Sequence, residues 1–177
     1  MADGNFHERA AALILLSGLP GAGKTTFAVA LAKELNFDHI ESDVIRRRLS
    51  ASPVYSRGEN GAVFAIVDSE TRKALKAGRH ALVDATNLTV KDRARFLDIV
   101  RDLGARLVAV RVVAPEPTIR ERLSRPREGF SQAGLDVFER VKTRTELIAA
   151  PVVVVDTRFD LAPSVRSVVE LVVGRKR

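Results

Sequence analysis

The stretch Gly18-Leu19-Pro20-Gly21-Ala22-Gly23-Lys24-Thr25-Thr26 decides the fold of this chain. An apolar run, Ala11–Ser17, precedes it, and a second apolar segment, Phe27–Ala32, follows it. A strand, a glycine-rich turn and a helix in this order fit the pattern G-x-x-x-x-G-K-[ST], whose backbone N–H groups hold the phosphates of a nucleotide. We therefore expect this loop to bind a nucleoside triphosphate.

Each part of the loop has an expected role in holding the nucleotide. The turn Gly21-Ala22-Gly23 aims backbone N–H groups at the phosphate chain, and the helix that opens beyond it adds the positive end of its dipole. We expect Lys24 to reach the β- and γ-phosphates and to act in catalysis. The hydroxyl of Thr25 is expected to bind Mg²⁺, and Thr26 to line the nucleotide site beside it.

Composition describes one ordinary globular domain spanning residues 1–177, with 46% hydrophobic and 29% charged residues. Because the chain has no cysteine, a disulfide framework and a thiolate metal site are excluded. The net charge of +7 fits a nucleic-acid partner, and equally a protein that contacts many phosphates. No apolar run is long enough to cross a membrane, so we expect no membrane partner and a cytoplasmic location.

Strands and helices alternate along the chain, which predicts a parallel sheet covered on both faces. We expect strands at 11–17, 38–41, 80–84, 107–113 and 152–155, and helices that begin near 24, 43, 63, 89, 115, 135 and 165. The stretch 51–58 is expected to be a loop, and the helix from 135 is expected to run to 148. Thr89 and Asp92 fit a helix N-cap pattern, and Gly104 is expected to end that helix. The fold class is thus a three-layer α/β P-loop fold with a five-stranded parallel sheet. Ligands of such sheets bind at the carboxyl ends of the strands, where the phosphate loop, Asp43, Asp84 and Asp156 all fall.

Two of these carboxylates have expected chemical roles. Asp84 ends an apolar strand, as does the acid that holds Mg²⁺ or its water in P-loop enzymes. The alternative for Asp84 is a cap on its own loop. Asp43 precedes Arg46 by one helical turn, so a proton acceptor and an anion-binding fork would share one face. The alternative for Asp43 is a simple helix N-cap.

An arginine-rich segment is expected to form a lid over residues 115–136. Four arginines crowd it: Arg120, Arg122, Arg125 and Arg127. Nearby acids can pair with some of them: Glu116, Glu121 and Glu128. We therefore expect two of the four arginines to act in catalysis, by neutralising charge on the transferred phosphoryl group.

The phosphate loop, Ser42–Arg46, Val83–Leu88 and the arginines at 122–127 together resemble the P-loop kinase family of phage polynucleotide 5′-kinase. This branch includes zeta toxin and gluconate kinases. The resemblance implies ATP as phosphoryl donor and Mg²⁺ as cofactor, with Asp43 as general base. It also implies acceptor contacts, which fall on these residues: Asp43, Arg46, Thr86, Asn87 and Arg93. Among the lid arginines, the resemblance implies a catalytic role for Arg122 and Arg125 and contact with the nucleotide for Arg122 and Arg127.

Three readings of the function stay open. The first is transfer of the γ-phosphoryl group to a polynucleotide 5′-OH, and the second is transfer to a small hydroxylated molecule. The third is an ATPase switch without a phosphoryl acceptor, which would not need the pair Asp43 and Arg46. His7, His39 and His80 have no metal-ligand spacing in the sequence, and we expect no metal role for them.

Overall fold

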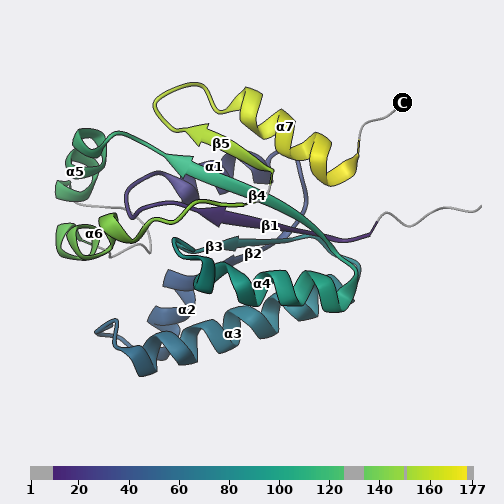
Figure 1. Cartoon of the computed structure of the whole chain (residues 1–177), viewed down its shortest axis with the longest axis horizontal. Helices are drawn as coiled ribbons and strands as arrows, with labels where there is room; N and C mark the ends of the chain where they lie inside the picture. The colour runs from purple at the N-terminus through teal and green to yellow at the C-terminus, as the bar shows by residue number, and fades with distance from the viewer. Residues whose placement is uncertain (1–9, 126–133, 150, 175–177) are drawn as a thin grey trace, which may run out of the picture.

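Five parallel strands form the centre of the molecule, which is described here by a computed structural model of residues 10–125, 134–149 and 151–174 (Figure 1). The strands are β1 (Ala12–Ser17), β2 (Asp38–Glu41), β3 (Ala81–Asp84), β4 (Arg106–Val113) and β5 (Val152–Asp156). Their order in the sheet is β2-β3-β1-β4-β5, so the strand before the phosphate loop is central. The expected α/β fold is confirmed.

Helices join the strands and cover both faces of the sheet (Figure 1). The helices are α1 (Lys24–Ala32), α2 (Ser42–Leu49), α3 (Arg57–Lys76), α4 (Val90–Leu103), α5 (Glu116–Ser124), α6 (Leu135–Val141) and α7 (Ala162–Val173). A short 3₁₀ turn, η1 (Lys142–Arg144), follows α6.

Alternate residues of β1 divide the core into two halves, as expected for a strand buried on both faces. Ile14 and Leu16 pack with residues of α1 and α7, whereas Leu13 and Leu15 pack with residues of α3 and α4. The sheet is therefore the middle of three layers.

Local signals set the bounds of several helices. Thr89 and Asp92 form a reciprocal capping box at the start of α4, as the sequence predicts. Gly104 ends that helix with φ 60°, the left-handed conformation that glycine adopts without cost.

Two helix boundaries differ from the sequence-based expectation. Helix α3 begins at Arg57, inside the expected loop, because the hydroxyl of Ser56 accepts a hydrogen bond from Glu59 N and caps it. The helix expected to run to Ile148 ends at Val141, and contacts with Leu88 and Arg93 hold the following segment in an extended course.

Within the described ranges, no helix combines the length and the apolar character that a membrane span requires.

Candidate active site

The phosphate loop connects β1 to α1 and requires glycine at two close approaches. A Cβ atom at position 18 would lie 2.3 Å from the carbonyl oxygen of Val112, a contact that no side chain tolerates. Gly23 has φ 99° and caps α1 in the left-handed region, where a Cβ would also meet Thr157. The close packing of the loop against β4 and the segment after β5 explains these glycines.

Lys24 and Thr25 start α1 and bring their polar groups to the mouth of the loop. Lys24 Nζ donates to the carbonyl oxygens of Gly18 at 3.0 Å and Leu19 at 3.2 Å. Thr25 Oγ1 donates to Asp84 Oδ2 at 2.8 Å. Neighbouring ligands of an octahedral Mg²⁺ lie about 2.9 Å apart, so these two oxygens fit the expected Mg²⁺ site. Thr26 is exposed beside them.

Asp84 is 6% exposed, and its neighbours keep it ionised. Burial by itself would raise the pKa of this carboxyl, but His39, Lys24 and Thr25 together lower the pKa below its usual value. His39 Nε2 lies 3.6 Å from Asp84 Oδ2, and His39 Nδ1 lies 3.5 Å from Glu41 Oε1. Glu41 behaves in the opposite way, since burial is the main cause that raises its pKa.

The turn after β3 is fastened to the phosphate loop. Asn87 Nδ2 donates to Leu16 O at 2.7 Å, Ser17 Oγ donates to Asn87 O at 3.0 Å, and Gly18 N donates to Thr86 O at 3.0 Å. Asn87 is 1% exposed and adopts φ 44°, a left-handed conformation that asparagine tolerates. In this arrangement Asn87 ties two strand ends together, whereas Thr86 is half-buried beside it.

Arg93 is 6% exposed and bonds to backbone carbonyl oxygens. Its Nη1 donates to Asn87 O at 3.0 Å and Leu88 O at 2.8 Å, and its Nη2 donates to Leu147 O at 2.7 Å. These bonds join the start of α4 to the segment after η1. The geometry gives Arg93 and Asn87 positioning roles here, and the acceptor contacts expected of them stay predictions.

Asp43 lies in the first turn of α2, directly beyond the carboxyl end of β2. Helix α2 is capped at Glu41, so the N-cap role considered for Asp43 is wrong. Asp43 lies close to Tyr55: burial is the main cause that raises the pKa of Tyr55, and the charge of Asp43 adds to it.

Arg46 is 5% exposed and is held by residues of α3. Its Nη1 lies 2.6 Å from Glu59 Oε1, its Nη2 donates to Asn60 Oδ1 at 2.7 Å, and its guanidinium stacks on Tyr55 with 4.4 Å to the ring centre. Glu59 Oε2 also accepts from Tyr55 N, which fixes the loop before α3. The positive charge of Arg46 is thus balanced inside the protein.

Among the lid arginines that the structure describes, Arg122 reaches the phosphate loop. Its Nη1 donates to Thr157 Oγ1 at 2.8 Å and approaches Gly21 O and Ala22 O at 3.3 Å each. Arg125 is exposed and pairs with Glu121, as Arg120 does with Glu116, which confirms part of the expected acid pairing. Arg127 and most of the lid's second half lie outside the described residues.

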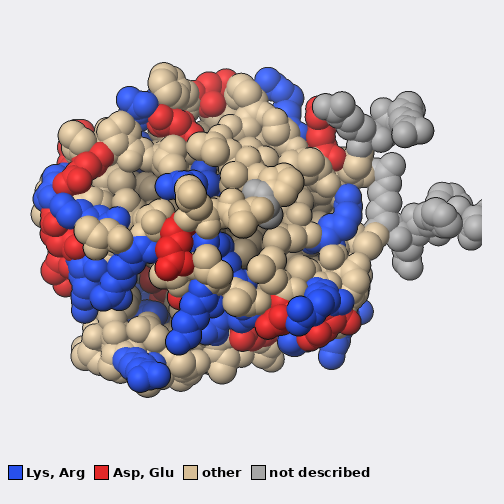
Figure 2. All heavy atoms as spheres, viewed as in Figure 1, with Lys and Arg blue, Asp and Glu red and all other residues tan. Residues whose placement is uncertain are grey.

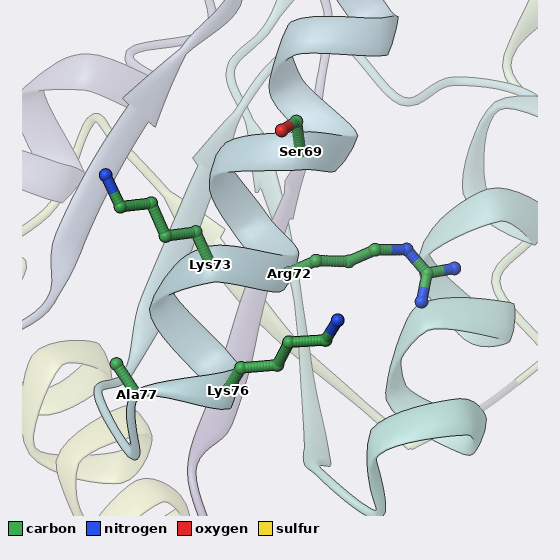
Figure 3. Close-up of a pocket in the computed structure, with 5 residues that line it drawn as sticks. All are labelled: Ser69, Arg72, Lys73, Lys76 and Ala77. Carbon is green, nitrogen blue, oxygen red and sulfur yellow. The ribbon is translucent and has the colours of Figure 1, made fainter.

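A hollow of about 540 Å³ lies on another part of the molecule (Figure 3). It is lined by the last turns of α3, where Lys73 points to one side of the helix and Arg72 and Lys76 to the other. Helix α3 leads into the amino end of β3, whereas the phosphate loop follows the carboxyl end of β1. The hollow and the loop therefore lie at opposite ends of the strands, and the hollow is separate from the site.

Basic side chains are interspersed with acidic ones on the face shown in Figure 2, including the side where α5 and α6 lie. Arg120, Glu116, Glu139 and Lys142 form one such mixed cluster between these two helices. This face therefore shows no single-sign stripe of charge.

Sequence reasoning missed three groups that the fold brings to the site: Glu59, Thr157 and the pair His39 with Glu41. The pair had a readable signal, since residues 39 and 41 alternate along a strand and must point to the same face. Glu59 and Thr157 gave no comparable signal, because their contacts join segments far apart in the chain.

Comparisons with known proteins agree with this geometry. A family model described as an AAA domain matches residues 13–148. The structure of Kti12 from Chaetomium thermophilum in complex with ADP-AlF3 is similar, with a TM-score of 0.72 and 18% identity, covering 92% of this chain and 100% of that one. A search among curated proteins gave no match.

Two kinases also share the fold. The APS kinase CysC of Mycobacterium tuberculosis, in complex with AMPPNP and APS, has a TM-score of 0.68 and 16% identity, covering 92% of this chain and 98% of that one. A gluconokinase from Sinorhizobium meliloti 1021 has a TM-score of 0.68 and 19% identity, covering 93% and 95%. These likenesses establish a kinase-like P-loop fold, and their names point to different acceptors.

Proposed function

The chain belongs to the AAA domain family, and from this premise we propose that it is an ATP- and Mg²⁺-dependent kinase that phosphorylates an acceptor hydroxyl. One observation carries the proposal. The Thr25–Asp84 contact of 2.8 Å is compatible with a Mg²⁺ site beside nucleotide phosphates, and a second carboxylate, Asp43, follows the neighbouring strand. A nucleotide switch has no use for that second acid.

The proposed reaction is an in-line transfer of the γ-phosphoryl group, in which side chains of this protein move the proton and stabilise the charge. The acceptor oxygen forms a bond to the γ-phosphorus while the bond from that phosphorus to the β–γ bridging oxygen breaks, and ADP leaves. Asp43 accepts the proton of the acceptor hydroxyl. Lys24 turns from its carbonyl partners to the β- and γ-phosphates, and Arg122 and Arg125 balance charge on the transferred group. Mg²⁺, when bound at Thr25 and Asp84, neutralises phosphate charge.

The acceptor that we favour is a polynucleotide 5′-OH. The resemblance of Asp43 and Arg46 to the acceptor side of polynucleotide kinases supports it, and the basic net charge is compatible with it. Arg46 would hold the phosphate next to the reacting hydroxyl, in exchange for its bond to Glu59.

A small hydroxylated acceptor is the second candidate, and the Arg46–Glu59 pair favours it. The carboxylate of Glu59 lies 2.6 Å from Arg46 Nη1 and already balances its charge. An uncharged acceptor could then bind beside Asp43 without breaking that pair, which is costly to separate when buried.

Labelled γ-phosphoryl ATP and a panel of acceptors test the proposal. The panel holds 5′-OH DNA and RNA oligonucleotides, nucleoside 3′-monophosphates, plain nucleosides, gluconate and an aminoglycoside. Label on the oligonucleotides or 3′-nucleotides supports the favoured acceptor. Label only on an unphosphorylated small molecule moves the assignment to the second candidate. Label released only as inorganic phosphate, with every acceptor unlabelled, overturns the kinase proposal in favour of a switch.

A further inference from the structure

Three metal-ligating side chains meet at the ends of β2 and β3. His39 and Glu41 project from the same face of β2, and Asp84 is paired with Glu41 in the register between the two strands. One ligand atom from each of the three lies within 4.8 Å of the others. A cation with bonds of about 2.1 Å holds ligand atoms at most about 4.2 Å apart, so a small rotation of the half-buried Glu41 completes the set.

The imidazole in this cluster lacks the hydrogen bond that a buried ring nitrogen normally has. His39 Nε2 is buried, and within the described residues it has no hydrogen-bond partner. It points toward Asp84 Oδ2 from 3.6 Å, which is too long for a normal hydrogen bond. A bound cation would give this nitrogen a partner and would offset the repulsion between the two neighbouring carboxylates.

We propose that His39, Glu41 and Asp84 form a site for a divalent transition-metal ion such as Mn²⁺ or Zn²⁺, which binds without a nucleotide. A nitrogen ligand with two carboxylates suits these ions, whereas Mg²⁺ prefers oxygen ligands and keeps most of its water. Three protein ligands hold the ion, and its remaining positions take water.

This site differs from the Mg²⁺ site in what completes it. The pair Thr25 and Asp84 supplies two oxygens, and a Mg²⁺ ion there depends on the phosphates of the nucleotide. The histidine site needs neither the phosphates nor Thr25. Because Asp84 belongs to both, an ion on His39 and Glu41 places a second positive charge next to the phosphate loop.

Titration of the nucleotide-free protein with Mn²⁺, followed by the loss of the free-ion signal in electron paramagnetic resonance, tests the site. We expect one Mn²⁺ per chain, held at least about tenfold tighter than Mg²⁺ in competition. His39→Gln and Glu41→Gln should each weaken Mn²⁺ binding by about tenfold or more. Thermal melts check that both variants fold.

Two matched variants act as controls. Asp38→Asn removes a carboxylate from the other end of β2, where it pairs with Arg79, and should leave Mn²⁺ binding unchanged. Thr25→Ala removes the Mg²⁺ ligand and should also leave nucleotide-free Mn²⁺ binding within about twofold. If Thr25→Ala abolishes binding, the ion sits in the phosphate loop and the proposal is wrong.

Absence of Mn²⁺ and Zn²⁺ binding, or unchanged binding in folded His39→Gln, would also overturn the proposal. Binding of a non-hydrolysable ATP analogue with Mg²⁺ is measured on the same samples, and phosphoryl transfer from ATP to the acceptor panel is measured in parallel. If the protein binds the analogue and transfers phosphoryl groups from ATP but does not bind Mn²⁺, the kinase assignment stands and the histidine site alone fails.

Discussion

Lys24 rests on the carbonyl oxygens of Gly18 and Leu19 and must leave them when phosphates arrive. Lys24→Ala should lower turnover by about 10²–10³-fold, because its ammonium stabilises charge that grows on the transferred group. Steady-state rates with the best acceptor of the panel measure the loss. Lys33→Ala, an exposed lysine beyond α1, is the control and should keep full activity. A Lys24→Ala enzyme with more than about a tenth of normal turnover would place the donor elsewhere.

Asp43 is the residue on which the kinase proposal depends most. Asp43→Asn should slow phosphoryl transfer by about 10²–10⁴-fold, because the amide cannot accept the proton of the attacking hydroxyl. Affinity for ATP·Mg²⁺ should change by less than about threefold, a difference below 1 kcal/mol. Calorimetric titration with a non-hydrolysable analogue separates the two quantities. Binding weakened about tenfold or more would show that Asp43 holds the metal ion instead.

Arg46 tests the nature of the acceptor. A charge-assisted hydrogen bond contributes about 1.5–3 kcal/mol, so Arg46→Ala should weaken the use of a phosphorylated acceptor by about 10–100-fold. Glu59→Gln should act in the opposite direction, because it keeps the shape of the partner but frees the charge of Arg46. The ratio kcat/KM for 5′-OH oligonucleotides measures both changes. Equal loss in the two variants would show that Arg46 only supports the α2–α3 contact.

At the scale of elements, Arg93 joins α4 to the extended segment after η1. Its bonds to Asn87 O and Leu88 O hold the turn after β3, and its bond to Leu147 O holds the segment after η1. Asn87 O keeps Ser17 Oγ and Leu88 O keeps Glu146 N as a donor, so Arg93→Ala removes the bonds of the guanidinium itself. The loss of three such bonds should reduce the free energy of unfolding by about 3 kcal/mol, a Tm decrease of about 6–12 °C.

Arg95 on the same helix provides the control for that measurement. It is half-buried, lies 3.6 Å from Asp68 and stacks on Phe64, but within the described residues it bonds to no buried carbonyl, and Arg95→Ala should cost about 1 kcal/mol or less. Thermal unfolding followed by circular dichroism compares the two variants. A Tm for Arg93→Ala within about 2 °C of normal would rule out the positioning role.

The order of the elements could be read from the sequence because their signals are local. The motif from Gly18 to Thr26, the capping box of Thr89 and the stop at Gly104 each depend on neighbours in the chain. Helix α6 ended early because a distant residue, Arg93, holds the segment beyond it. The pairing of Arg46 with Glu59 could not be predicted from the sequence either, because it depends on how α2 packs against α3.

At the scale of the whole molecule, acid should destabilise the protein through its paired carboxylates. Arg79 lowers the pKa of Asp38, and Arg46 lowers that of Glu59. A carboxyl with a lowered pKa in the folded state stabilises it fully above the unfolded pKa, near 3.8 for Asp38 and 4.5 for Glu59. That stability is lost as pH falls through the folded pKa. Burial raises the pKa of Glu41 and Asp68. These two carboxyls therefore destabilise the folded state at neutral pH, and protonation of them at lower pH relieves that cost.

Burial also lowers the pKa of His80, so a first loss of stability begins as pH falls below about 6.5. We therefore expect a Tm that is nearly constant above about pH 7 and falls toward about pH 2, most steeply where the paired carboxylates titrate. Asp38→Asn, which loses the contact with Arg79, should flatten part of this fall. Glu41→Gln should raise the Tm slightly near neutral pH in the presence of a chelator, because it removes a carboxylate that burial disfavours. Melting curves across the pH range check both, and a Tm that rises on acidification would contradict the assignment of these pairs.

The parallel sheet also determines where the protein can be attached to a surface without covering the phosphate loop. Strand β1 begins at Ala12, and α7 ends at Val173, both on the side of the molecule opposite α5 and α6 (Figure 1). An anchor attached at either position would hold the protein on a bead or sensor surface with its phosphate loop turned toward solution. Immobilised and free preparations should then bind a large ligand equally fast, which would make surface-based kinetics suitable for testing the proposed oligonucleotide acceptors.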